Sequence, residues 1–264
     1  MRTLSHYLRV YKRLLVMNWL SLLVYPANFF NAGVASVAWG FFSLYSIILL
    51  TFSVTNVWGW HREELLFLNG MYGVIVGIFH MVFSNNMYNL PRKIHLGELD
   101  NLLLKPMDEQ FLISVWSTNF TSILRIGMTL VYVLYLLVSL HILFSIERII
   151  FFIVLAICGI ILLYAIWYLI LTITIWYSKL TNLVDLLFTI QGVSRYPQEM
   201  TKQLAFYFFV FFFPWTLPIT IPAKVLLGKD TGEVTQLLLL TGLSVGACRF
   251  FWKFALRYYT SASS

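Results

Sequence analysis

The sequence predicts an all-α, polytopic membrane protein with six transmembrane helices. Apolar residues make up 60% of the 264-residue chain and charged residues only 11%. The charges also cluster between long runs that carry none. A soluble domain of average composition has about 25% charged residues, so this chain has too little charge to cover a surface that faces water. We expect one membrane domain over residues 1–264.

Residues 1–25 predict an amphipathic helix at the membrane interface. Apolar side chains recur there at helical spacing, and Arg2, Arg9 and Arg13 lie on roughly the opposite face. Lys12 adds a further basic residue to the interface helix. Such a helix lies in the plane of the interface. It is either a plain anchor or a surface on which a partner docks. No small-residue cleavage site follows it, so we expect no cleaved signal peptide.

Six apolar runs are long enough, or nearly long enough, to cross a bilayer, for which about 20 residues suffice. Pro26 separates the first of them from the interface helix. The predicted spans are residues 27–55, 65–90, 111–140, 149–177, 180–194 and 234–256.

The stretch 203–223 is also apolar, but prolines at 214, 218 and 222 interrupt it. Each proline removes a helix hydrogen bond. We therefore interpret residues 195–230 as a re-entrant helix pair before the last span, with a seventh crossing as the alternative. The aromatic side chains here mark a bilayer interface or form an outer gate, for which the candidates are Phe209, Phe212, Phe213 and Pro214.

Lysine and arginine concentrate on the cytoplasmic side of membrane proteins. With six spans, eleven of the 18 basic residues fall on one side: Arg2, Arg9, Lys12, Arg13, Arg92, Lys93, Lys105, Lys179, Arg249, Lys253 and Arg257. Six fall on the other side, and Arg125 lies within a span. Both termini are therefore expected in the cytoplasm, and the net charge of +7 is interpreted as membrane orientation and not as binding of nucleic acid.

The cytoplasmic loop 91–110 predicts a short helix that opens at Gly97 and stops at Pro106. Acidic Glu98 and Asp100 precede basic Lys105, which matches the helix dipole. The leucines of this helix share one face, namely Leu99, Leu102 and Leu103. An exposed apolar face of this kind covers either the bilayer surface or a groove on another protein.

Two further patterns lie inside the spans. Gly73–Gly77 and Gly242–Gly246 are GxxxG pairs, which pack helices within one subunit or at a dimer interface. Arg125 and Asp185 are the charges deepest in the spans. They either neutralise each other as an intramembrane pair or line a substrate path.

No catalytic, cofactor-binding or metal-binding residue is predicted. The five histidines never approach H-E-x-x-H spacing, and Cys158 and Cys248 are isolated. Gly228-Lys229 is not a phosphate loop because Asp230 replaces the Ser or Thr.

Several segments nevertheless resemble the permease subunits of type 2 ATP-binding-cassette transporters, in particular a subfamily with a Gly-Glu-Leu-Asp…Leu-Leu-Lys/Arg-Pro loop. Here the loop is Gly97–Asp100 and Leu103–Pro106, and the other similar segments are residues 27–29, 59–64, 195–197, 221–228 and 257–264.

The resemblance implies a half-transporter in the cytoplasmic membrane that pairs with a second permease and exports its cargo. A separate ATPase would bind ATP and Mg²⁺ and dock on the interface helix and the 91–110 loop. The alternative classes are a self-contained secondary transporter or channel and a membrane-embedded enzyme. Many secondary transporters contain internal repeats, but we see no repeat between the two halves of this chain. We also see no paired acid and base of the kind that a membrane-embedded enzyme needs.

Overall fold

The computed structural model describes residues 4–52, 56–142, 145–180, 182–203, 214–229 and 232–260. Five helices in this part are long and apolar enough to cross a membrane. They are α2 (Pro26–Leu50), the continuous helix Arg62–His95, α7 (Ser122–Ser139), the continuous helix Ile146–Ile175 and α13 (Val234–Leu256). The predicted class, an all-α membrane protein, is confirmed at this level.

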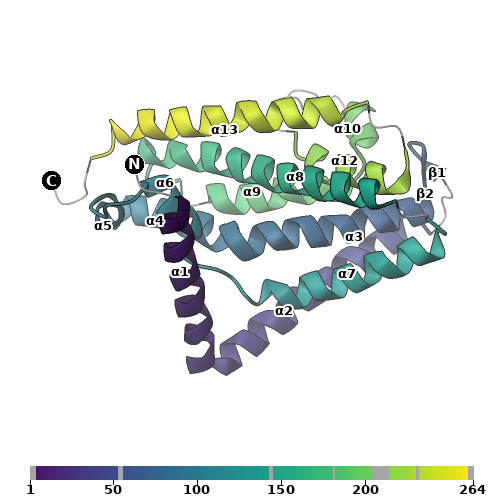
Figure 1. Ribbon diagram of the computed structural model, residues 1–264, viewed down its shortest axis with the longest axis horizontal. Helices are drawn as coiled ribbons and strands as arrows, with labels where there is room; N and C mark the ends of the chain where they lie inside the picture. The colour runs from purple at the N-terminus through teal and green to yellow at the C-terminus, as the bar shows by residue number, and fades with distance from the viewer. Residues whose placement is uncertain are drawn as a thin grey trace.

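The long helices lie side by side in layers (Figure 1). The helix Arg62–His95 comprises α3 (Arg62–Phe79), a π-helical segment η1 (His80–Ser84) and α4 (Asn85–His95). It packs against α7 and α2 on one side and against α8 (Ile146–Thr172) and α12 (Leu217–Leu227) on the other. On its far side α8, which continues into η2 (Ile173–Ile175), packs against α13. The core therefore lies around α3 and α8.

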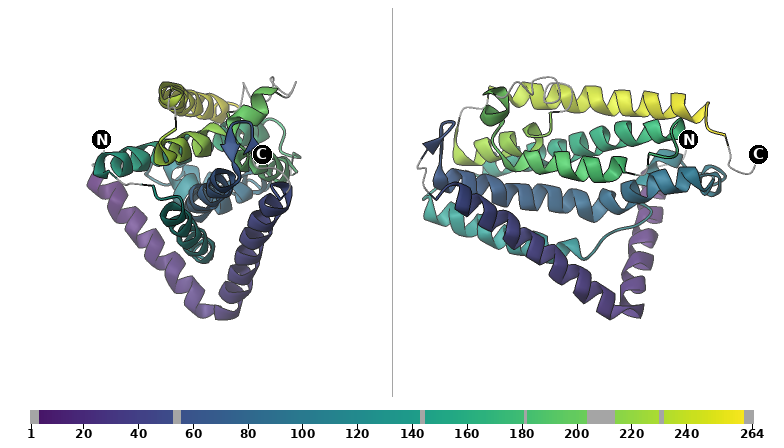
Figure 2. Two further views of the ribbon diagram at one scale, coloured as in Figure 1. Left: turned by 90° about the vertical axis from the view of Figure 1, so that its right-hand side faces the viewer. Right: turned by 180° about the vertical axis from the view of Figure 1, so that it is seen from behind.

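The amphipathic N-terminal segment forms α1 (Leu4–Val24), which runs across the direction of the long helices (Figure 1). With α2 it makes a V whose apex points away from the bundle (Figure 2). The start of α1 lies at the same end of the molecule as α5 (Asp100–Leu103), α6 (Glu109–Val115) and the end of α13 (Figure 1). The opposite end carries the hairpin of β1 (Asn56–Val57) and β2 (Trp60–His61), an antiparallel pair.

The predicted third span, 111–140, is interrupted. Its first part is α6, and residues 116–121 form no helix before α7 begins. Polar side chains compete with the helix here. Asn86 donates to the carbonyls of Ser114 (2.8 Å) and Ser117 (2.7 Å) and accepts from the Ser117 amide.

The predicted fifth span, 180–194, is shorter than a normal crossing. It consists of α9 (Leu183–Gln191) and the 3₁₀ turn η3 (Gly192–Arg195) and is not among the five long helices. α9 packs beside α8. The backbone groups at the ends of a short helix are tolerated at membrane depth where neighbouring protein shields them from lipid.

Of the three prolines in this stretch, Pro214 precedes the short helix α12 and is not helical, and the other two lie inside it. Pro218 is in its first turn, where a missing N–H costs nothing, and Pro222 lies within it. Because Pro222 has no N–H, the Pro218 carbonyl lacks its usual helix partner. That carbonyl lies against Gly159 of α8, so closely that a Cβ at Gly159 would be 2.5 Å from its oxygen. The short helix α10 (Gln198–Gln203) precedes α12, and the residues between them lie outside the described part.

Candidate functional site

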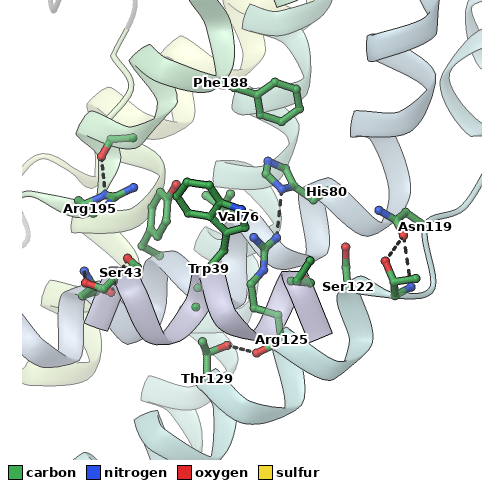
Figure 3. Close-up of a pocket in the computed structure, with 18 of the residues that line it drawn as sticks. Trp39, Ser43, Val76, His80, Asn119, Ser122, Arg125, Thr129, Phe188 and Arg195 are labelled. Atoms are coloured by element: carbon green, nitrogen blue, oxygen red, sulfur yellow. Dashed lines mark hydrogen bonds between the residues drawn. The ribbon is translucent and has the colours of Figure 1, made fainter. Parts of the chain in front are cut away.

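A cavity of about 660 Å³ lies at membrane depth between α2, α3, α7, α9 and η3. Small side chains of α2 form one wall, including Ala32, Ala35 and Gly40. Arg125 and His80 lie in its middle, with Arg195 toward one side and Asn119 toward the other (Figure 3). Its volume falls in the range of small-molecule sites, which is about 300–1,000 Å³.

Arg125 comes from the first turn of α7 and points at the π-helical segment of the neighbouring helix (Figure 3). Its Nη2 is 3.0 Å from Nδ1 of His80, whose Nε2 is 3.3 Å from Oε1 of Gln191. A guanidinium only donates, so Nδ1 of His80 is the acceptor. Nε2 therefore carries the hydrogen and donates it in the hydrogen bond to Oε1 of Gln191. The contacts define a neutral imidazole held between an arginine and an amide. π-Helical segments recur at functional sites.

Of the two alternatives for Arg125 and Asp185, the intramembrane pair does not form. Asp185 is exposed on α9, and no ion pair joins the two side chains in the described part of the chain. Instead Arg125 faces the cavity. Sequence reasoning missed His80, which it tested only as a metal ligand. The available signal was that His80 is the single histidine in the sequence of the predicted span 65–90.

The polar lining of the cavity continues along α2 and α3. Ser43 donates to Oδ1 of Asn69 (3.2 Å), and Asn69 is 2% exposed. Arg195 donates through Nε to the Gly192 carbonyl (2.9 Å) and lies over the ring of Tyr72. The cavity therefore offers polar groups at several points of a lining that is otherwise mostly apolar.

The cytoplasmic loop differs from its predicted form. Gly97 does not open a helix: it has φ of +70° and follows the end of α4, where its amide donates to the Ile94 carbonyl (3.2 Å). Glycine ends helices in this left-handed conformation because it has no Cβ. The following helix, α5, has only four residues and begins at Asp100.

The three leucines of this loop do not share an exposed face. Leu99 is 0% and Leu102 5% exposed, because both pack into the core of this chain. The exposed leucines are Leu104, at 84%, its neighbour Leu103 and Leu96. Of the other predicted loop residues, Pro106 is exposed, Glu98 is half-buried and Lys105 lies over the Trp116 ring.

Among the predicted interface residues, Arg9, Lys12 and Arg13 are exposed on α1, while Arg2 lies outside the described residues. α1 contacts the break before α7: Asn18 donates to the Trp116 carbonyl (3.1 Å). Of the proposed gate residues, Pro214 is buried, and Phe209, Phe212 and Phe213 lie outside the described residues.

A polar network joins α6 to α8 and α13. Asp108 caps α6 by accepting from the Phe111 amide (3.0 Å) and forms an ion pair with Arg249 of α13. Gln110 accepts from Arg249 (3.0 Å) and donates to the Tyr164 hydroxyl (3.1 Å). A displacement of α6 would therefore act directly on two long helices.

A second network lies at the opposite end. Lys224 forms ion pairs with Glu199 (2.7 Å) and Glu233 (3.0 Å), and Lys229 with Glu64 (2.6 Å). Burial alone would raise the pKa of Glu199, but the hydrogen bonds to its carboxylate, the one from Lys224 first among them, and the positive charge of Lys224 together outweigh burial and lower that pKa below its ordinary value. The network thereby fastens α12 to α10 and to the start of α3.

The described residues contain no cluster of three His, Cys, Asp or Glu side chains that could hold a metal ion. The fold and the cavity define a helical membrane protein with an internal cavity, lined by both polar and apolar side chains, between its long helices.

The chain belongs to the ABC-2 family of transporter proteins, whose family model matches residues 37–263. No curated protein and no solved structure matches it. The resemblance stated on the loop residues is thereby confirmed at the level of the family, which consists of membrane transport subunits.

Proposed function

We propose that this chain is the membrane half of an exporter whose energy comes from ATP hydrolysed, with Mg²⁺, by a separate cytoplasmic ATPase. The family match over residues 37–263 carries this proposal. The chain would sit in the cytoplasmic membrane with both termini in the cytoplasm. Six crossings, of which α9 with η3 makes the fifth, bring both ends of the chain to one side.

We define the docking surface as the exposed apolar residues of the loop, Leu96, Leu103, Leu104 and Pro106. It lies at the end of the molecule where α1 begins (Figure 1), and the first half of α1 carries its basic residues. An exposed apolar patch rimmed by polar residues is typical of a protein–protein interface. If the docked ATPase displaced α6, the network of Asp108, Gln110 and Arg249 would displace α8 and α13 with it.

A second permease would close the cavity. α2 and α9 border the cavity, and both helices carry exposed apolar side chains, among them Trp39, which lines the cavity, and Leu186. In this arrangement the cavity is part of the transport path, and the outer gate of Phe209, Phe212, Phe213 and Pro214 stays a prediction.

The docking proposal is tested by replacing Leu96 and Leu104 with serine. Fully burying a leucine contributes about 1.5–3 kcal/mol, and each 1.4 kcal/mol is about tenfold in affinity. The double variant should therefore lose co-purification of the ATPase by at least about tenfold while the permease stays inserted. Leu239→Ser with Leu243→Ser, two exposed leucines of α13, is the matched control. Unchanged capture and ATPase activity of the Leu96/Leu104 variant would contradict docking at this surface.

The topology is tested by single cysteines in a background that lacks Cys158 and Cys248. Glu63→Cys and Glu147→Cys, both at exposed positions, should react with an impermeant thiol reagent added outside intact cells. Leu104→Cys and Arg257→Cys should react only after the membrane is permeabilised. Labelling of Arg257→Cys from outside would mean an even number of crossings between Glu147 and Arg257, and would contradict the six-span arrangement, which has an odd number between them.

A further inference from the structure

The cavity between α2, α3, α7 and α9 has an uncompensated positive charge. Arg125 and Arg195 both line it, and the described lining residues include no aspartate or glutamate. The hydrogen bond from Arg125 to His80 leaves the guanidinium charge in place, because the imidazole it contacts is neutral. A charged side chain at membrane depth is costly unless a partner offsets it. The geometry therefore leaves a place for an anion.

Two buried donors in this region lack a partner. The Nε of Arg125 and the Nε2 of Gln191 are both buried without a hydrogen bond in the described structure, and Gln191 is 1% exposed. Buried donors are normally satisfied. Since the Nε and Nη groups of arginine form a planar fork that matches carboxylate and phosphate oxygens, the unsatisfied Nε marks where such a group can bind.

The remaining wall of the cavity is apolar and reaches the outside of the bundle. Val76 and Phe188 line it together with Trp39, which is 68% exposed. A second, shallower hollow lies against Trp39 between Ala35, Ala38 and Phe42 of α2. An alkyl chain can pass along this wall from the polar centre to the hydrocarbon of the bilayer.

We propose that the cavity binds the anionic headgroup of an amphiphile, a phosphate or carboxylate on an alkyl tail. Arg125 holds the headgroup, Arg195 supplies a second positive charge, and the tail lies along Trp39 and Phe188. His80 and Gln191 are positioning residues that orient the Arg125 guanidinium. This assigns a cargo class to the cavity and so rests on the proposed transport path, but binding itself needs no ATPase.

The test measures equilibrium binding of radiolabelled dodecyl phosphate to the purified permease in phosphatidylcholine nanodiscs, with empty nanodiscs subtracted. Binding should saturate and weaken as salt rises. Dodecyltrimethylammonium, which has the same tail and the opposite charge, should not compete. Hydrogen bonds to charged groups account for roughly tenfold to a hundredfold in affinity, so Arg125→Gln should weaken binding by that factor. Arg125→Lys should lose less, and Arg257→Gln, at an exposed position outside the cavity, should bind as the parent does.

Arg195→Gln provides a second variant should Arg125→Gln fail to fold, with an expected loss of a few fold to tenfold. Adding phosphatidylglycerol to the nanodiscs identifies the source of the ligand. Competition that depends on Arg125 assigns the site to a bilayer lipid, and lack of competition assigns it to an amphiphile that is not a lipid of the bilayer. Equal competition by the cationic probe, or parental affinity in both arginine variants, would overturn the proposal. Because no ATPase is present, failure here leaves the docking result unaffected.

Discussion

The helices α2 and α3 have the same mean hydropathy in their most apolar windows, yet they occupy different environments. In the helix that begins with α3, 61% of the window is buried, compared with 22% in α2. Hydropathy reports how well a segment partitions into hydrocarbon, and lipid tails are as apolar as leucine. It therefore cannot tell a helix that contacts protein from one that contacts lipid.

The burial of α3 is accompanied by close packing at its glycines, which the glycines of α13 lack. Gly70, Gly73 and Gly77 of α3 lie against side chains of α7, so the GxxxG pair of α3 packs within one subunit. Gly242 and Gly246 of α13 face open space within the described structure. The same sequence pattern thus serves a buried contact in one helix and has no contact in another. The described chain covers little of α2 and α13, so most of their apolar surface faces outward.

The largest expected effect comes from Gly159→Ala in α8. Its Cβ would lie 2.5 Å from the Pro218 carbonyl oxygen and 3.1 Å from the Pro218 Cα, and backbone atoms cannot rotate away. Overpacking of this kind costs about 1–3 kcal/mol, and we expect a value at the upper end, seen as a lower midpoint of thermal unfolding in detergent.

Gly242→Ala is the matched control, since nothing lies within 4 Å of the Cβ it would add. Replacing a mid-helix glycine with alanine stabilises a helix by about 0.5–1 kcal/mol. Equal midpoints for the Gly159 and Gly242 variants would mean that α12 does not contact α8 as described.

A smaller effect is expected from Gly73→Ala in α3. The added Cβ would lie 2.5 Å from Cγ2 and 2.9 Å from Cβ of Thr129, whose hydroxyl donates to the Arg125 carbonyl (2.9 Å) and so resists rotation. We expect a loss of about 1–2 kcal/mol, measured by thermal unfolding. The double variant Gly73→Ala with Thr129→Ala should recover part of the loss, because contacting residues couple.

Gly40→Ala in α2 is the control for this contact. Its Cβ would meet the terminal methyl of Met128 at 2.6 Å, and a methionine side chain adapts readily. The change in midpoint should be small. A Gly40 variant as unstable as the Gly73 variant would contradict the difference between the two helices.

Much of the architecture follows from the sequence alone. Charge-free runs of sufficient length locate α2, α3 and α8, and an apolar run with charges only toward its end locates α13, because segments this long and this apolar partition into the bilayer. The loop motif from Gly97 to Pro106 indicates the family, and the family match confirms it.

Only the tertiary structure decides which side of each segment is covered. Leu99 and Leu104 are alike in the sequence, but one is buried in the core and the other is exposed, since local periodicity does not record the position of neighbouring helices. Arg125 has His80 as its partner and not Asp185 because α7 lies against the helix Arg62–His95, a contact between residues 45 positions apart in the chain. The break before α7 depends on Asn86, which reaches the Ser114 and Ser117 carbonyls only after the chain has folded back on itself. The sequence determines which segments enter the bilayer, because apolar burial depends on composition. The cavity around Arg125 and His80 depends on how α2, α3, α7 and α9 pack against one another, and so it exists only in the folded chain.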